Sequence, residues 1–217
     1  MIPLLLWRCP LCTANDALVH VERLFRPDLV RCRSCAARWR VRRVPGDNFY
    51  LELIEADRGA GDERTITAWY DAMKRTVRLV PIDDPAVSLE TDETLYLASG
   101  MVELQAEESD PSFFPGAPDA TRMDKREIEG RLVGRGRLFL TNQRLIWQGD
   151  GSHRCFPLSR VSSAYALLNY GLTLLVEMRL YTVYFLQESP LKWVTYLALV
   201  ARQVQAETGH LIATSHF

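Results

Sequence analysis

Cys9-Pro10-Leu11-Cys12 and Cys32-Arg33-Ser34-Cys35 are the two stretches on which the fold of this chain depends. Each Cys-x-x-Cys pair brings two sulfurs to one side of a tight turn, and two such turns facing each other supply four thiolates. Four thiolates form a ligand set for tetrahedral Zn²⁺, and we expect Cys9, Cys12, Cys32 and Cys35 to bind it. A site closed by four sulfurs leaves no position for substrate or activated water, so the expected zinc is structural.

Short strand patterns surround the two cysteine pairs. Residues 17–21, 38–42 and 49–54 are typical of strands, with a turn at 45–48. Two metal-bearing turns and a small antiparallel sheet make residues 1–57 resemble a zinc ribbon, on the strength of the cysteine spacing and the Cys-Pro-x-Cys form. The resemblance implies a fold without a function, because zinc ribbons serve transcription proteins, ribosomal proteins and protein-docking modules.

The composition and the number of cysteines limit the classes of protein to which this chain can belong. With 217 residues, 47% hydrophobic and 24% charged, the chain has the composition of an ordinary soluble globular protein. Cys155 stands outside the metal pattern, which disfavours a disulfide framework and favours a reducing compartment. The apolar run Ile2–Trp7 lacks the basic region of a signal peptide and predicts a strand, and no stretch reaches the roughly 18 apolar residues of a membrane span. We expect a cytoplasmic protein without a transmembrane segment, with peripheral membrane contact at most.

Charge is segregated along the chain. Residues 1–45 carry nine arginines and three acids, residues 46–130 carry twenty acids and eight basic residues, and residues 131–217 carry nine basic residues and four acids. Strand alternation places Arg38, Arg40 and Arg42 on one face and Trp39 on the other. Spaced arginines can track phosphates, which makes this face a candidate for a partner or a nucleic acid. The competing interpretation is a solvated strand face, or a face neutralised by the acidic middle of the chain.

Residues 58–85 are predicted to form a flexible joint and an amphipathic linker helix. Gly59 and Gly61 favour a joint. The apolar residues from Ile66 to Val77 recur at helical spacing, with Asp62 or Thr65 as the N-cap and Pro81 as the stop. We expect the aromatic stripe of this helix to be buried against one of the two domains.

Residues 86–217 have the pattern of a second, β-rich domain. Residues 94–104 predict a strand with a kink at Gly100, and residues 136–147 predict a hairpin with a polar corner at Thr141-Asn142-Gln143. Between them, residues 105–124 form a long acidic loop rich in Pro, Ser and Gly, in which Phe113 and Phe114 are candidate anchors. Four further strand patterns follow, and then a helix that Ser189 can cap and that Pro190 begins, ending before Gly209.

The motif from Gly136 to Trp147, Gly-x-Leu-x-Leu-Thr-Asn-x-Arg-Leu-Ile-Trp, resembles the GRAM family and the related GLUE domain, both built on the pleckstrin-homology fold. The order of about seven strands and one C-terminal helix is similar to that fold as well. The resemblance implies a β-barrel capped by the C-terminal helix, and a platform that binds phosphoinositides, membranes or proteins. The expected fold class is therefore mainly β with α: a four-cysteine zinc ribbon, a linker helix and a pleckstrin-homology-like barrel.

In lipid-binding members of that fold, basic residues on the first two strands hold the phosphates of the headgroup. The candidates here are Lys125, Arg126, Arg131, Arg135 and Arg137. However, residues 94–104 contain no Lys or Arg, and the acids that follow would repel an anionic headgroup. This departure from the family pattern weakens the expectation of lipid binding at these positions.

Three functions follow from these patterns. The first is a non-enzymatic adaptor in which the ribbon and the barrel bind a protein partner. The second is peripheral attachment to phosphoinositides or other anionic lipids through the barrel, and the third is nucleic-acid binding through the arginine face of the ribbon. An enzyme is not expected, because the one thiol and base close in sequence, Cys155 and His153, have no evident oxyanion site.

Overall fold

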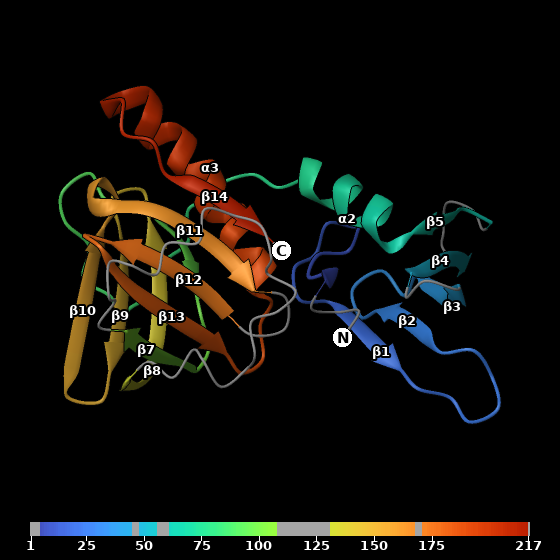
Figure 1. Cartoon of the computed structure of the whole chain (residues 1–217). Helices are drawn as coiled ribbons and strands as arrows, with labels where there is room; N and C mark the ends of the chain where they lie inside the picture. The colour runs from blue at the N-terminus through green and yellow to red at the C-terminus, as the bar shows by residue number, and fades with distance from the viewer. Residues whose placement is uncertain (1–4, 45–47, 56–60, 108–130, 168–170, 217) are drawn as a thin grey trace. The chain divides into compact units, whose positions relative to one another are not determined.

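The computed structural model describes residues 5–44, 48–55, 61–107, 131–167 and 171–216. The chain divides into two compact units, Met1–Val77 and Arg78–Phe217 (Figure 1). The first contains the four-cysteine cluster and a small sheet, and the second contains a curled sheet and the C-terminal helix. This confirms the mainly β fold class. The turn predicted at 45–48 and the glycine joint lie almost wholly outside the described residues, as does most of the acidic loop.

The first unit is built on a five-stranded antiparallel sheet in which each strand pairs with the next along the chain. The patterns at residues 17–21, 38–42 and 49–54 each fall within a strand. One strand that the sequence did not predict, Glu63–Thr65, pairs with the outer edge of its neighbour and lies where the helix was expected to begin. The strands are β1 (Leu18–Val21), β2 (Leu29–Cys32), β3 (Arg38–Val44), β4 (Asn48–Glu55) and β5 (Glu63–Thr65).

Helix α2 (Ile66–Arg75) belongs to the first unit and packs on its sheet. The Thr65 hydroxyl caps it by accepting the Ala68 amide (3.1 Å). Trp69 meets Trp39 of β3 edge to face, with ring centroids 6.1 Å apart, and donates its indole N–H to the carbonyl of Leu51 in β4 (3.0 Å). Both tryptophans are buried, so the aromatic stripe of the helix and the apolar face of the sheet form one core.

The strand predicted at the N-terminus is absent from its described part. Leu5–Trp7 contains no strand, and Leu6 and Trp7 are both 1% exposed. A strand with one buried face alternates inward and outward side chains, so it would not bury two consecutive residues on the same core. The backbone reaches a sheet-like pairing only at Arg8, which forms an isolated bridge with Asn15.

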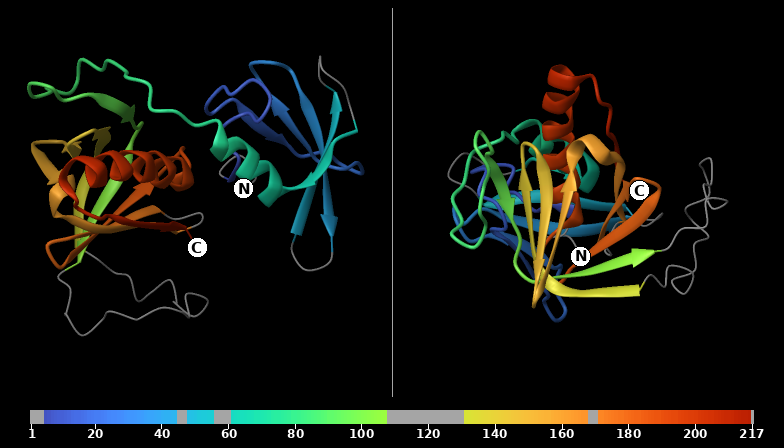
Figure 2. Two further views of the ribbon diagram at one scale, coloured as in Figure 1. Left: turned by 90° about the horizontal axis from the view of Figure 1, so that it is seen from above. Right: turned by 90° about the vertical axis from the view of Figure 1, so that its left-hand side faces the viewer.

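The second unit is a nine-stranded, strongly curled sheet (Figure 2). Its strand order is β10-β9-β8-β7-β13-β12-β11-β14, and β6 pairs with β8 beyond the end of β7. The pairings are antiparallel except that of β11 with β14. The strands are β6 (Leu95–Ala98), β7 (Val102–Glu107), β8 (Arg131–Thr141), β9 (Arg144–Gly149), β10 (Ser152–Pro157), β11 (Val161–Leu167), β12 (Gly171–Val176), β13 (Arg179–Phe185) and β14 (Ala213–His216).

Strands β6 and β7 follow the same edge of the long strand β8, with an interruption at residues 99–101. The interruption contains Gly100, where the sequence predicted the kink. On the other edge of β8, Gly136 pairs with Gly149 of β9. A Cβ atom at position 136 would lie 2.0 Å from the carbonyl oxygen of Gln148, so this close approach of two strands requires glycine.

Helix α3 (Pro190–Thr208) crosses the sheet with Ser189 at its N-cap and Gly209, in the left-handed conformation, at its C-cap. Its Trp193 is fully buried and stacks on Phe185 of β13, with ring centroids 5.3 Å apart. The short 3₁₀ helix η2 (Leu158–Arg160) joins β10 to β11. No helix within the described ranges is long and apolar enough to cross a lipid bilayer.

Candidate metal centre

The two Cys-x-x-Cys turns have the same local geometry. In each, the amide of the first cysteine donates to the carbonyl five residues later: Cys9 to Ala14 (2.9 Å) and Cys32 to Ala37 (2.8 Å). In each, the residue after the second cysteine has a positive φ, 62° at Thr13 and 57° at Ala36. This repeated turn directs both sulfurs of a pair to one side, as the spacing predicted.

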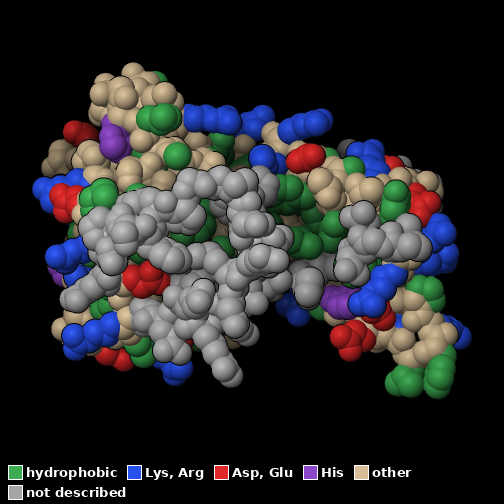
Figure 3. Space-filling model, in the orientation of Figure 1, with side chains coloured by type: hydrophobic (Ala, Val, Ile, Leu, Met, Phe, Trp, Pro, Cys, Tyr) green, Lys and Arg blue, Asp and Glu red, His purple; other side chains and the backbone are tan. Residues whose placement is uncertain are grey.

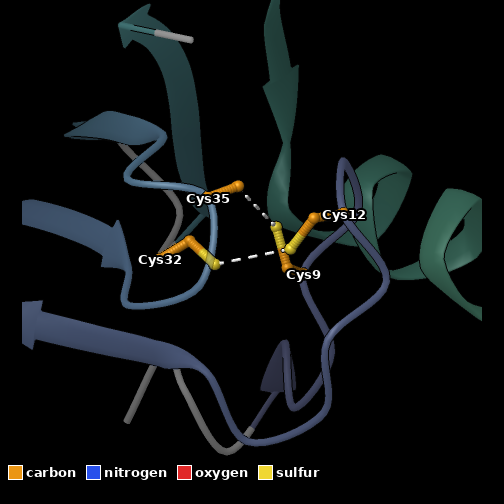
Figure 4. Close-up of side chains that lie close together, drawn as sticks. All are labelled: Cys9, Cys12, Cys32 and Cys35. Carbon is orange, nitrogen blue, oxygen red and sulfur yellow. Dashed lines mark hydrogen bonds between the residues drawn. The ribbon is translucent and has the colours of Figure 1, made fainter. Parts of the chain in front are cut away.

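All four sulfurs converge on one point (Figure 4). They lie within 4.8 Å of one another, with 3.8 Å between the sulfurs of Cys9 and Cys35 and 3.7 Å between those of Cys12 and Cys32. These distances are too long for a disulfide bond, which is about 2.05 Å. A tetrahedral ion with metal–sulfur bonds of about 2.3 Å separates any two sulfurs by about 3.8 Å. The cluster therefore has the size of a tetrahedral four-thiolate metal centre.

The four thiols, if deprotonated, would concentrate negative charge that a cation would have to balance. Burial raises the pKa of Cys9 and of Cys35. Burial acts in the same direction on Cys12, but hydrogen bonds from the Ala14 amide and the neighbouring thiols outweigh it and lower its pKa to about 7. Four adjacent thiolates would repel one another strongly. A bound divalent metal would compensate those charges and keep all four cysteines deprotonated.

The protein core fixes the first cysteine turn. Cys9 and Cys32 have no exposed surface, and Trp7, two residues before Cys9, is buried. The amide of Arg8 points at the sulfur of Met73 in α2 (3.3 Å), so the helix packs next to the metal ligands. Four cysteine ligands would complete the shell of a tetrahedral ion and would leave it no open coordination position.

The arginine face of β3 is neutralised within the same sheet. All three of its arginines are partly exposed, with 42% to 57% of each side chain accessible, and each has a carboxylate partner. Trp39 lies on the opposite, buried face, as alternation predicted. The ion pairs are Arg38 with Glu55 (3.0 Å), Arg40 with Glu52 (3.2 Å) and Arg42 with Glu63 (2.8 Å).

Two of the three basic candidates on β8 have acidic partners too. Arg135 pairs with Glu103 of β7 (2.6 Å), and Arg137 pairs with Asp84 (2.6 Å). Hydrogen bonds from Arg137 hold the pKa of Asp84 below its ordinary value. Arg131 begins β8, is exposed, and has no carboxylate partner among the described residues. Lys125, Arg126, Phe113 and Phe114 lie outside the described residues.

The structure does not bring His153 and Cys155 together as a catalytic pair. Both lie on β10, where His153 is exposed, and the sulfur of Cys155 is 3.8 Å from a guanidinium nitrogen of Arg144. Within the described ranges, no hydrogen bond joins the imidazole to the thiol.

Sequence reasoning missed one prominent surface feature, the tip of the β1–β2 loop. Leu24 is 84% exposed and Phe25 is 99% exposed. Hydrophobic side chains project at the end of this loop, at the lower right of Figure 3. The signal in the sequence was two adjacent apolar residues between Arg23 and Arg26, in a segment outside the predicted strands.

No protein-family model and no curated protein matches this sequence.

Proposed function

We propose that this chain is a non-enzymatic adaptor in which a structural zinc ion stabilises the first unit, and that this unit docks a protein partner through the tip of the β1–β2 loop. The ligand set supports zinc, because buried thiolates at tetrahedral spacing suit this ion better than hard, oxygen-preferring cations. The curled sheet followed by α3 supports a pleckstrin-homology-like second module for residues 86–217. Fold likeness alone does not assign a ligand to that module.

The observation that carries the proposal is the exposure of Leu24 and Phe25. Water contact with two large apolar side chains is unfavourable, and burying such a pair in a partner would remove that penalty. Phe25 also has a positive φ of 59°, a conformation that strains a bulky residue. Local stability would favour glycine or asparagine at this position, so the phenylalanine is explained by contact with a partner.

The base of the loop is held in place while its tip projects. Asp28 accepts a hydrogen bond from the Arg23 amide (3.2 Å) and pairs with His20 (3.2 Å). Within the described residues, the side chains of Arg23 and Arg26 have no carboxylate partner. The loop therefore presents an apolar anchor flanked by two positive charges, which fits an apolar pocket with an acidic rim on a protein partner.

Among the described residues, five of the six arginines on which the two alternative functions rest already have a carboxylate partner, and Arg131 is the exception. Phosphate binding by the β3 or β8 arginines would have to compete with the intramolecular ion pairs at both surfaces. Lipid binding through β8 and nucleic-acid binding through β3 are therefore less well supported than protein docking.

The test is affinity purification from the native lysate with full-length protein in zinc-retaining buffer. The tip variant Leu24→Asn/Phe25→Asn is compared with Leu211→Asn, which alters an exposed leucine in the second unit. We expect a stoichiometric protein that the unmodified chain and Leu211→Asn retain and that the tip variant loses. Equal recovery with the tip variant would refute docking at this loop, and recovery of lipid or nucleic acid alone would refute the adaptor.

A further inference from the structure

A surface pocket of about 460 Å³ in the second unit has an arginine rim. Its lining comes from β10, η2 and the β12–β13 hairpin, which are separate from the β6–β8 surface considered for lipid binding. Three arginines contribute to the lining: Arg154, Arg160 and Arg179. A pocket of this size is large enough for a small organic molecule.

Strands β10 and β13 each contribute an arginine and an aromatic residue to the pocket. On β10, Arg154 lies two residues before Phe156, and on β13, Arg179 lies two residues before Tyr181. Because side chains two apart share a face of a strand, each arginine lies on the same face as its aromatic neighbour. The two rings are nearly buried and in contact, with centroids 4.8 Å apart. They form an apolar floor, and the exposed arginines lie on the rim.

The positive charge of the rim is only partly compensated. Glu177 is the one acid among the described lining residues, and it pairs with Arg160 (3.1 Å). Both members of this pair are about 60% exposed, so solvent screens their attraction. Neither Arg154 nor Arg179 has a carboxylate partner in the described part of the chain. This distinguishes them from the arginines of β3, and from Arg135 and Arg137.

The hairpin that carries Arg179 has a defined shape. Glu177 and Met178 both have a positive φ, 48° and 66°, which is the backbone of a tight two-residue turn between strands. The amide of Glu177 also lies 3.4 Å from the carbonyl of Arg160, so the turn meets η2 through both backbone and side chain. These contacts keep Arg160 and Arg179 at the rim of the same pocket.

We infer that this pocket binds an anion that carries phosphate, with Arg154 and Arg179 as its principal ligands. Guanidinium groups donate paired hydrogen bonds to phosphate oxygens, and two arginines without internal partners can do so without breaking an existing ion pair. The phosphate could belong to a soluble phosphate ester or to a lipid headgroup, since both present the same oxygens to the rim.

The experiment uses the full-length protein and two probes, inositol hexakisphosphate in solution and phosphatidylcholine vesicles with or without phosphatidylinositol bisphosphate. Arg154→Gln and Arg179→Gln are each expected to weaken binding about tenfold, the effect of losing one charged hydrogen bond. Arg202→Gln, at an exposed position of α3, is the matched control and should bind as the unmodified protein does. Glu177→Gln removes the one acid of the rim and should strengthen binding several-fold, a gain that misfolding would not produce.

Each outcome has a defined meaning. Arginine-dependent binding to inositol hexakisphosphate without binding to vesicles supports the pocket and a soluble source of the phosphate. Arginine-dependent binding to the vesicles that contain phosphatidylinositol bisphosphate supports the pocket and a lipid source. The inference is overturned if neither probe binds, if Arg154→Gln and Arg179→Gln leave binding unchanged, or if Arg202→Gln weakens binding as much as they do. Because the tip of the β1–β2 loop is unchanged in all these variants, this result is separable from the test of protein docking.

Discussion

The carboxylate of Glu93, whose side chain has no exposed surface, lies against the guanidinium of Arg144. The hydroxyl of Thr141 donates to the same carboxylate (2.7 Å), and the side chain of Asn142 accepts the Thr94 amide (2.8 Å). The polar corner of the hairpin at 141–144 therefore anchors the segment that leads into β6. Burial alone would raise the pKa of Glu93, but its hydrogen bonds, first among them those from Arg144, lower it.

Glu93→Gln should destabilise the second unit at neutral pH by about 3 kcal/mol, because it leaves the charge of Arg144 with a neutral partner in a partly buried site. The folded-state pKa of Glu93 is lowered, so its contribution is full above the ordinary value of 4.5 and is lost as the pH falls through the folded-state pKa. Urea denaturation at several pH values should therefore show that acid lowers the free energy of unfolding less in the variant than in the unmodified protein. Glu90→Gln removes the exposed partner of Arg144 and should change stability by less than about 1 kcal/mol. Equal effects would contradict the assignment.

Phe25→Asn should stabilise the first unit by roughly 0.5–1 kcal/mol, because asparagine tolerates a positive φ and the phenylalanine ring makes no packing contact to lose. Leu24→Asn is the matched control, since Leu24 is similarly exposed but has no positive φ, and its stability should be unchanged. Thermal denaturation of both variants measures the difference. A large loss of stability in Phe25→Asn would show that the ring packs within the protein and does not project to a partner.

Helix α2 completes the core of the first unit through Trp69. Trp69→Ala should destabilise that unit by about 3 kcal/mol, because it removes a ring that is 3% exposed and a hydrogen bond to the Leu51 carbonyl. Lys74→Ala, on the exposed side of the same helix, should have little effect. Urea denaturation followed by tryptophan fluorescence and by NMR would measure both. Unchanged stability in Trp69→Ala would contradict the packing of α2 on this sheet.

Local chemistry made the cysteine turns, the hairpin at 136–147, the N-cap of α2 and the C-cap of α3 predictable, whereas α2 ends at Arg75, before the stop predicted at Pro81. Thr65 and Gly209 act where the sequence placed them. Strand alternation likewise placed Trp39 inside, because burial on one face fixes the register.

Features that depend on distant pairing were not predictable. The partner of Arg40 is Glu52 because β3 and β4 pair in one register, and Arg137 meets Asp84 across more than fifty residues. The arginine-rimmed pocket joins β10 to the β12–β13 hairpin, and nothing local relates Arg154 to Arg179. The sequence showed the charges of these residues without showing which of them would find partners.

For the whole molecule, neutralisation of charge takes place largely inside each unit. The first unit pairs its β3 arginines with acids from β4 and β5, and the second pairs Arg135, Arg137 and Arg144 with acids from its own first segments. Basic and acidic side chains accordingly lie interspersed on the face shown in Figure 3. Ion pairs within each unit thus neutralise much of the charge that is segregated along the sequence. The loop tip and the arginine-rimmed pocket remain as the distinctive surfaces.

We propose that a four-cysteine zinc centre holds the first unit folded while the second unit folds without it. The most direct measurement is zinc content, followed by two-dimensional amide NMR of the full-length chain before and after removal of metal with a chelator under reducing conditions. We predict one zinc ion per chain, and on its removal a collapse of amide dispersion for residues 5–77 while residues 78–217 keep their shifts. Cys32→Ser should give the same spectrum. If the chain contains no metal and both units keep their amide dispersion, a metal centre does not hold the first unit folded.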